Sequence, residues 1–189
     1  MTQRRRTWLR WLLLGCGGIA VWQLACHFGQ RSGPANLVNQ IWLERWPRDA
    51  RDMVWHFVAI DQKDRRVGSL GKASRWRVAS DAFVWSQEGA ELRARFPQND
   101  CRLSFEVRSW KCAGEAPEPF ELCLEVKANG RVYRYFSRTE WVVHPHGEVD
   151  EQLAWLTPAV QAAFIRGEDE TPEERGGAGA CAAFGPSLE

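Results

Sequence analysis

The sequence predicts a mainly β protein, an antiparallel meander that closes into a small up-and-down barrel or forms a strongly curved sheet. A C-terminal helix follows the meander, and one N-terminal membrane helix precedes it. Three observations support this prediction. Short runs of β-branched and aromatic residues separated by turn signals fill residues 37–143, a helical pattern begins only after residue 143, and an arginine-flanked apolar stretch opens the chain.

Composition narrows the function classes. The 189 residues include 25 Lys plus Arg and 24 Asp plus Glu, so no net field attracts nucleic acid, and nucleic-acid binding is not expected. The chain carries no phosphate-binding glycine loop, His-Glu-x-x-His or Gly-x-Ser-x-Gly motif. We therefore predict no cofactor.

The leader predicts a membrane segment. Arginines 4, 5, 6 and 10 precede an uncharged stretch, residues 11–28, that reaches about 27 Å as a helix. The charge bias places the N-terminus in the cytoplasm and the rest of the chain outside it, periplasmic or extracellular. An uncut signal anchor is the leading interpretation.

Other interpretations of the leader stay open. The sequence LLGC, Leu13–Cys16, resembles a bacterial lipoprotein cleavage box, in which Cys16 would be lipidated. RRTWLR, Arg5–Arg10, resembles a twin-arginine export signal. Full cleavage or a plain buried helix are the remaining possibilities. The predicted organisation is a leader over 1–28, a linker over 29–36, a β-rich domain over 37–166 and a disordered tail over 167–189.

Two hairpins are predicted within the domain. A turn at Glu88–Gly89 would pair Trp85 with Leu92 and Phe83 with Ala94. Asn129–Gly130 fits a type I′ turn, because both central residues of that turn need positive φ. The pairs predicted outward from this second turn are Val126 with Tyr133, Leu124 with Tyr135, Glu125 with Arg134 and Glu121 with Arg138.

The end of the domain predicts a helix from Pro158, with Thr157 as N-cap and Gly167 at its end. An opening strand around Trp42, successive hairpins and this closing helix resemble the architecture of lipocalin-type calycin barrels. The resemblance is one of outline, because Asn39-Gln40-Ile41 precede Trp42 where those families usually carry Gly-x-Trp.

Cysteines and histidines are the candidate chemical residues. Cys112 and Cys123 bracket a ten-residue loop and predict a disulfide, with two free thiols as the alternative. Cys101 has no obvious partner, although Cys181 could pair with it or between chains. The metal-site candidates are His144, His146 and Glu148, since His-x-His presents two imidazoles on one side of an extended segment. Solvated loop histidines are the simpler interpretation.

Tryptophans and arginines suggest two binding surfaces. Trp55, Trp76 and Trp85 would fill a barrel or line an apolar ligand site. The arginines at positions 75, 77, 93, 95, 102 and 108 alternate with other residues and predict either a solvated outer face or an anion-binding one.

The sequence thus predicts a membrane-tethered binding module for a small apolar ligand or an envelope protein. The ligand version requires an internal cavity, and the partner version requires a filled interior with an exposed patch around Trp110, Trp141 or Ala116–Pro119. The alternative is a cell-envelope hydrolase or isomerase in which His56, His144 or His146 meets a carboxylate. An enzyme is the less favoured interpretation.

Overall fold

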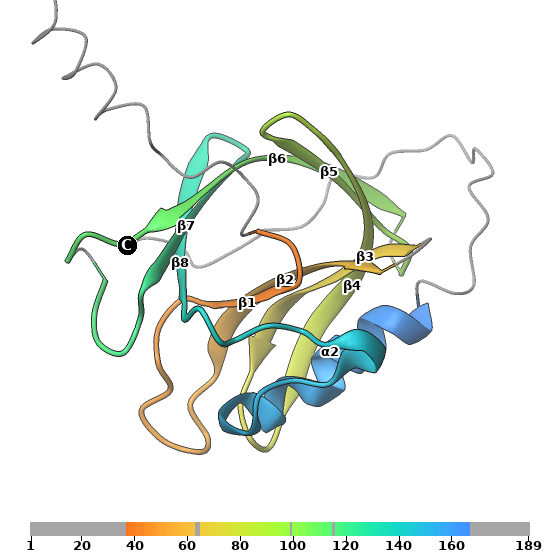
Figure 1. Cartoon of the computed structure of the whole chain (residues 1–189). Helices are drawn as coiled ribbons and strands as arrows, with labels where there is room; N and C mark the ends of the chain where they lie inside the picture. The colour runs from red at the N-terminus through yellow and green to blue at the C-terminus, as the bar shows by residue number, and fades with distance from the viewer. Residues whose placement is uncertain (1–36, 63–64, 99, 115, 167–189) are drawn as a thin grey trace, which may run out of the picture. The chain divides into compact units, whose positions relative to one another are not determined.

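The computed structural model describes residues 37–62, 65–98, 100–114 and 116–166. Within them the chain forms a closed antiparallel barrel whose eight strands follow in sequence order, so that β8 returns to β1 (Figure 1). The strands are β1 (Gln40–Leu43), β2 (Val54–Gln62), β3 (Arg65–Ala73), β4 (Val78–Glu88), β5 (Glu91–Phe96), β6 (Cys101–Lys111), β7 (Leu122–Ala128) and β8 (Arg131–Ser137). The mainly β prediction is confirmed, and the barrel, rather than an open curved sheet, is the form adopted.

An aromatic cluster occupies the interior. The Phe57 ring on β2 contacts Phe83, Phe105 and Tyr135 on β4, β6 and β8, with ring centroids 5.9, 6.3 and 6.2 Å apart. Because these rings come from alternate strands around the barrel, they meet across its middle. Offset and edge-on contacts of this kind add to the free energy of burial. Side chains therefore fill the barrel at the level of Phe57.

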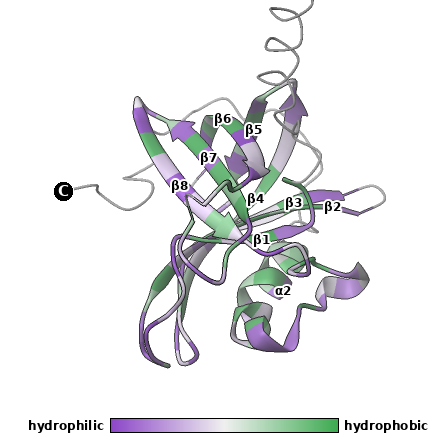
Figure 2. Cartoon of the chain, turned by 60° about the vertical axis from the view of Figure 1, so that its left-hand side comes forward, coloured by the Kyte–Doolittle hydropathy of each residue, from purple (hydrophilic) through white to green (hydrophobic). Residues whose placement is uncertain are grey.

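A helix covers part of the outer face. The two 3-10 turns η2 (Pro145–Gly147) and η3 (Glu151–Leu156) lead into α2 (Thr157–Arg166), which packs against β3 and β4. Val160 and Ala163 are fully buried in a second apolar cluster with Val58 of β2 and Ala82 of β4. Figure 2 shows hydrophobic residues along α2 where it faces the strands.

The start of α2 differs from the prediction. Thr157 is not an N-cap, because its φ of −48° and ψ of −45° are already helical and α2 continues directly from η3. The cap stands one element earlier, at Asp150, whose carboxylate accepts a hydrogen bond from the Gln152 backbone N–H at 2.8 Å. The predicted helix itself is confirmed.

The register of the second hairpin is confirmed. Asn129 and Gly130 have φ of 51° and 74°, as a type I′ turn requires. Three of the predicted pairs form: Val126 with Tyr133, Leu124 with Tyr135 and Glu125 with Arg134. The fourth does not form, because Glu121 accepts hydrogen bonds from Thr139 while Arg138 pairs with Glu140 at 2.6 Å.

The register of the first hairpin was wrong by two residues. The observed pairs are Trp85 with Ala94 and Gln87 with Leu92, so the turn lies at Gly89–Ala90. Gly89 has φ of 61° as the first loop residue, and Ala90 is not among the positive-φ residues, which is the requirement of a type II′ turn. A shift of two residues leaves every side chain on its predicted face.

The N-terminal and C-terminal predictions, residues 1–36 and 167–189, lie outside the described residues. Cys16 and the membrane segment over residues 11–28 belong to this part of the chain. Within the described residues, no helix has the length and apolar character needed to cross a membrane.

Candidate functional site

An outer groove runs over β4, β5 and β6, with a volume of about 490 Å³. Its described lining is Val84, Trp85, Ser86, Arg93, Ala94, Arg95, Arg102, Leu103 and Ser104. Three of these residues are arginines, two are serines and none carries a carboxylate. We refer to this surface as the arginine groove.

Strand alternation places the three arginines outside. Leu92, Ala94 and Phe96 of β5 are buried in the interior cluster, so Arg93 and Arg95 between them point outward. The groove also depends on register, because Arg93 lies opposite both Ser86 and Ser104. Sequence alternation predicted the outward arginines. The two serines were missed, because their contribution depends on pairing between strands.

Two neighbouring positions in the groove carry the same charge. Arg95 of β5 lies directly opposite Arg102 of β6, and Val84 of β4 lies opposite Arg95 on its other side. Like charges at directly opposed positions repel each other. Both arginines also take part in other interactions. An anion that contacts both guanidinium groups would accept charge-assisted hydrogen bonds from each.

Carboxylates stand at the rim of the arginine groove. Arg93 pairs with Glu88 at 3.1 Å and with Glu91 at 3.3 Å. The hydrogen bond from Arg93 holds the pKa of the Glu91 carboxyl below its usual value. Arg95 is 3.6 Å from Asp100, which is longer than a good hydrogen bond. Carboxylates at the rim therefore lie within ion-pair distance of both Arg93 and Arg95.

The three predicted ligand-binding tryptophans have different surroundings. Trp85 is buried, and its indole N–H donates to the backbone oxygens of Val67 at 2.9 Å and Ile60 at 3.2 Å. Trp55 is half-buried, with the Lys72 ammonium 5.1 Å from its ring. Trp76 is 77% exposed in the loop between β3 and β4. Trp85 thus holds strands together, whereas Trp76 faces solvent.

The predicted partner patch does not form at Trp141. That side chain is fully buried in the apolar cluster beneath α2, where it stacks on Trp46 with ring centroids 5.5 Å apart. Trp110 is half-buried on the outer face of β6, and the Arg108 guanidinium lies 5.4 Å from its ring. In the loop Ala116–Pro119, the third part of the predicted patch, residues 117–119 are exposed.

The metal-site candidates lie around η2. His144 and His146 are exposed, and the His144 backbone N–H donates to the Glu148 carbonyl at 2.8 Å. In the part of the chain that the structure describes, no group of three or more His, Cys, Asp or Glu side chains is arranged to hold a metal ion. The metal prediction gains no support from this geometry.

His56 of β2 is fully buried. Its Nε2 is 3.0 Å from the Ser69 hydroxyl, and its Nδ1 has no hydrogen-bond partner in the structure. Burial lowers the pKa of His56 to about 4, so the ring is neutral at pH 7. This environment is that of a histidine packed in an apolar core.

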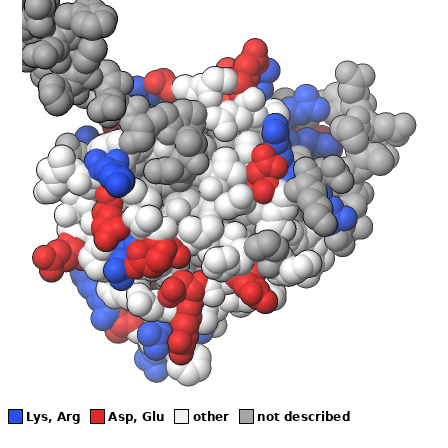
Figure 3. Space-filling model, viewed as in Figure 1, with Lys and Arg blue, Asp and Glu red and all other residues white. Residues whose placement is uncertain are grey.

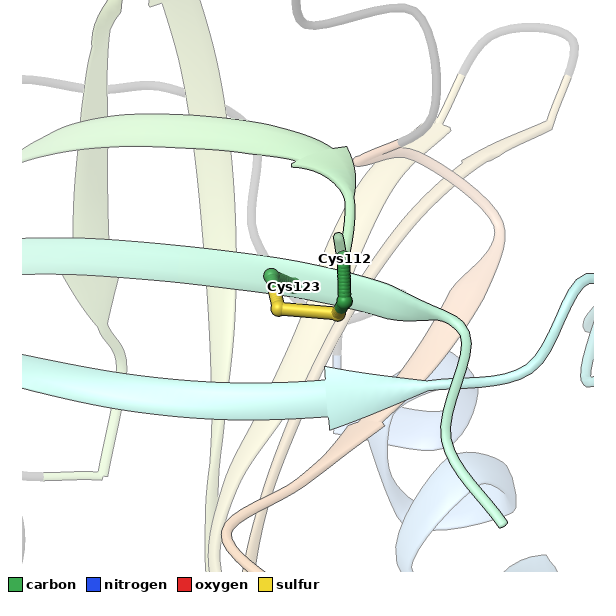
Figure 4. The surroundings of a disulfide bond; sticks show 2 residues. All are labelled: Cys112 and Cys123. Carbon is green, nitrogen blue, oxygen red and sulfur yellow. A yellow bond between two sulfur atoms is a disulfide. The ribbon is translucent and has the colours of Figure 1, made fainter. Parts of the chain in front are cut away.

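The predicted disulfide is confirmed between Cys112 and Cys123, with Cα atoms 5.4 Å apart (Figure 4). The bond is diagonal, because Cys123 lies opposite Trp110 while the Cys112 backbone N–H donates to Glu121. Direct pairing of the two cysteines would have placed Arg108 opposite Lys127. The observed pairs are Arg108 with Glu125 and Glu106 with Lys127. Cys101 is also disulfide-bonded, and Cys181 lies outside the described residues.

The charge distribution on one face of the molecule is mixed. On the face seen in Figure 3, Lys and Arg side chains are interspersed with Asp and Glu, as the near-balanced composition leads us to expect. Neither a family model, nor a curated protein, nor a solved structure matches this chain. The functional assignment therefore depends on the geometry of the described residues.

Proposed function

We propose that this chain is a membrane-tethered binding module whose domain lies outside the cytoplasm and binds a partner protein. The arginine groove is its binding site, and an acidic segment of the partner is the bound element. The observation that carries the proposal is the directly opposed pair Arg95 and Arg102, set in a groove of about 490 Å³ whose described lining has no carboxylate. Carboxylates match the planar donor fork of arginine.

The filled interior of the barrel favours a binding site on its outer surface. A ligand-binding version requires a cavity of several hundred Å³ inside the barrel, whereas the Phe57 cluster fills the middle of it. The enzyme alternative requires a histidine beside a carboxylate. The hydrogen-bond partner of buried His56 is a serine, Ser69. These two observations favour recognition by the outer surface.

Two features support the proposed location. The arginine-flanked apolar stretch, residues 11–28, has the pattern of a signal anchor that leaves the following domain outside the cytoplasm. The Cys112–Cys123 bond is of a kind that persists in oxidising compartments. Together they favour the bacterial cell envelope, with lipidation at Cys16 as the alternative form of tether.

Binding of labelled octaglutamate to the detergent-solubilised full chain tests the site, with fluorescence anisotropy as the readout. We expect saturable binding that weakens as salt is raised, because the contacts are ionic. The double variant Arg95→Ala/Arg102→Ala should weaken binding at least fivefold. The matched control is Arg131→Ala/Arg134→Ala, which removes the same charge from exposed positions on β8.

Circular dichroism of each variant checks that the barrel has folded. Equal loss of affinity in both double variants would show nonspecific charge attraction and would overturn the assigned site. Lipid that co-purifies with the folded chain, identified by native mass spectrometry, would support the apolar-ligand alternative instead.

The tether has its own test. Intact mass spectrometry of the membrane-extracted protein should give the mass of the full 189-residue chain for a signal anchor. A mature chain beginning at a lipid-modified Cys16 would replace the signal anchor by the lipoprotein alternative. Recovery of the intact chain from the cytosolic fraction would overturn both.

A further inference from the structure

We propose that the acidic segment of residues 168–174 docks in the arginine groove of the same chain and competes with the partner for it. This inference depends on the proposed function and names how that site is regulated. The segment, EDETPEE, carries five carboxylates in seven residues, and the groove presents Arg93, Arg95 and Arg102. The two are complementary in charge.

The place where α2 ends makes the contact reachable. Arg166 is the last residue of α2, and α2 packs on β3 and β4. Residues 167–174 span about 26 Å when extended, at roughly 3.3 Å per residue. Adjacent strands lie about 4.8 Å apart, so β4 to β6 is about 10 Å. The segment is long enough to cross the groove.

The groove adjoins the surface that α2 covers. Val84 lines the groove and also packs against the apolar cluster beneath α2, together with Val160 and Ala163. β4 is therefore common to the arginine groove and to the surface that α2 covers. The extended length of the segment is enough to bring its carboxylates from α2 to Arg95 and Arg102.

Attachment to the same chain makes weak contacts sufficient. A short flexible connection gives an effective concentration in the millimolar range. A free acidic peptide with a millimolar dissociation constant would therefore be a poor ligand, yet the same sequence attached to α2 would occupy the groove for much of the time. A partner must then displace the segment, and its apparent affinity falls by the fraction of grooves that the segment occupies.

Neutralising the segment tests this proposal in the full chain. The tail variant replaces Glu168, Glu170, Glu173 and Glu174 by Gln and Asp169 by Asn. We expect octaglutamate to bind the tail variant at least threefold more tightly than it binds the wild type at low salt. The difference should disappear in the Arg95→Ala/Arg102→Ala background and persist in the Arg131→Ala/Arg134→Ala background.

A second measurement does not depend on the peptide. If the segment docks, neutralising it should lower the thermal unfolding midpoint in the wild type and in the Arg131→Ala/Arg134→Ala background. In the Arg95→Ala/Arg102→Ala background it should leave the midpoint unchanged, because the interaction is already lost.

The outcomes separate this inference from the proposed function. Equal octaglutamate affinity in wild type and tail variant, with equal unfolding midpoints, overturns the docking of the segment and leaves the arginine groove as a binding site. The docking is also overturned if neutralising the segment changes the unfolding midpoint by the same amount in the wild type and in the Arg95→Ala/Arg102→Ala background. Absence of octaglutamate binding in both forms overturns the proposed function, while coupling in the unfolding midpoints would still support docking of the segment.

Discussion

Gln40 and Ser137 join the first and last strands of the barrel, with Nε2 of Gln40 donating to the Ser137 hydroxyl oxygen at 2.7 Å. The hydroxyl in turn donates to the Ile41 carbonyl at 2.6 Å. Both side chains are buried. This network matters because β1 and β8 share one paired position, Leu43 with Phe136.

Replacement of Ser137 tests this closure. Ser137→Ala removes the acceptor of one buried hydrogen bond and the donor of another, so the free energy of unfolding should fall by about 1–3 kcal/mol in urea titrations. The matched control is Ser86→Ala, because Ser86 is exposed on β4 and should change stability by less than about 0.5 kcal/mol. Equal effects of the two variants would show that the network does not stabilise the seam.

Acid should destabilise the domain through His56. Its pKa in the folded state is about 4, below the unfolded value of about 6.5, so the unfolded chain takes up the proton first. The contribution of neutral His56 to the free energy of unfolding is therefore complete above about pH 6.5. It is lost as the pH falls toward 4, and the loss is up to about 3 kcal/mol. Urea titrations at pH 7.5, 6.5, 5.5 and 4.5 measure it.

Two variants separate His56 from other titrating groups. His56→Gln should reduce the loss of stability between pH 6.5 and pH 4.5, although its stability at pH 7.5 will also change. His144→Gln removes an exposed histidine and should keep the wild-type pH dependence. If both variants follow the wild-type profile, the buried imidazole is not the group responsible.

The disulfide should stabilise the fold by restricting the unfolded chain. Cys112 and Cys123 are separated by 11 residues, for which the chain-entropy model gives about 3 kcal/mol. The double variant Cys112→Ser/Cys123→Ser avoids leaving one unpaired thiol, and its free energy of unfolding under non-reducing conditions measures the effect. A change below about 0.5 kcal/mol would show that the strand pairing around the bond already restricts this loop.

Gly68 allows Phe83 to reach the interior cluster. The two residues are paired across β3 and β4, and a Cβ at position 68 would overlap the Phe83 ring and approach the Val58 carbonyl oxygen. Gly68→Ala should cost about 1–3 kcal/mol of stability. In the Phe83→Leu background the cost should be smaller, because part of the obstruction is gone. Additive effects in this double-mutant cycle would contradict the proposed steric conflict.

Some features of this fold follow from local sequence. Asn129–Gly130 specified both the turn and the register of β7 and β8, because few residue pairs accept positive φ at both positions. The outward direction of Arg93 and Arg95 followed in the same way from the apolar residues on either side of each arginine. The Cys112–Cys123 bond was one of two alternatives that the sequence left open, and its diagonal geometry was not predicted.

Other features were decided only by the tertiary structure. The strand pattern fits a turn at Glu88–Gly89 or at Gly89–Ala90 equally well, because a two-residue shift keeps every side chain on its face. The sequence also offered Trp141 as part of an exposed patch, whereas its side chain is fully buried and its ring contacts Trp46 and Phe120.

The sequence by itself determined a β meander with a closing helix and a row of outward arginines, since each depends on neighbours within a few residues. The tertiary structure decided that the meander closes through Gln40 and Ser137, that Phe57 fills its interior, and that Arg95 stands opposite Arg102. These depend on contacts between strands distant in the chain, where curvature and packing of the whole barrel fix which residues meet.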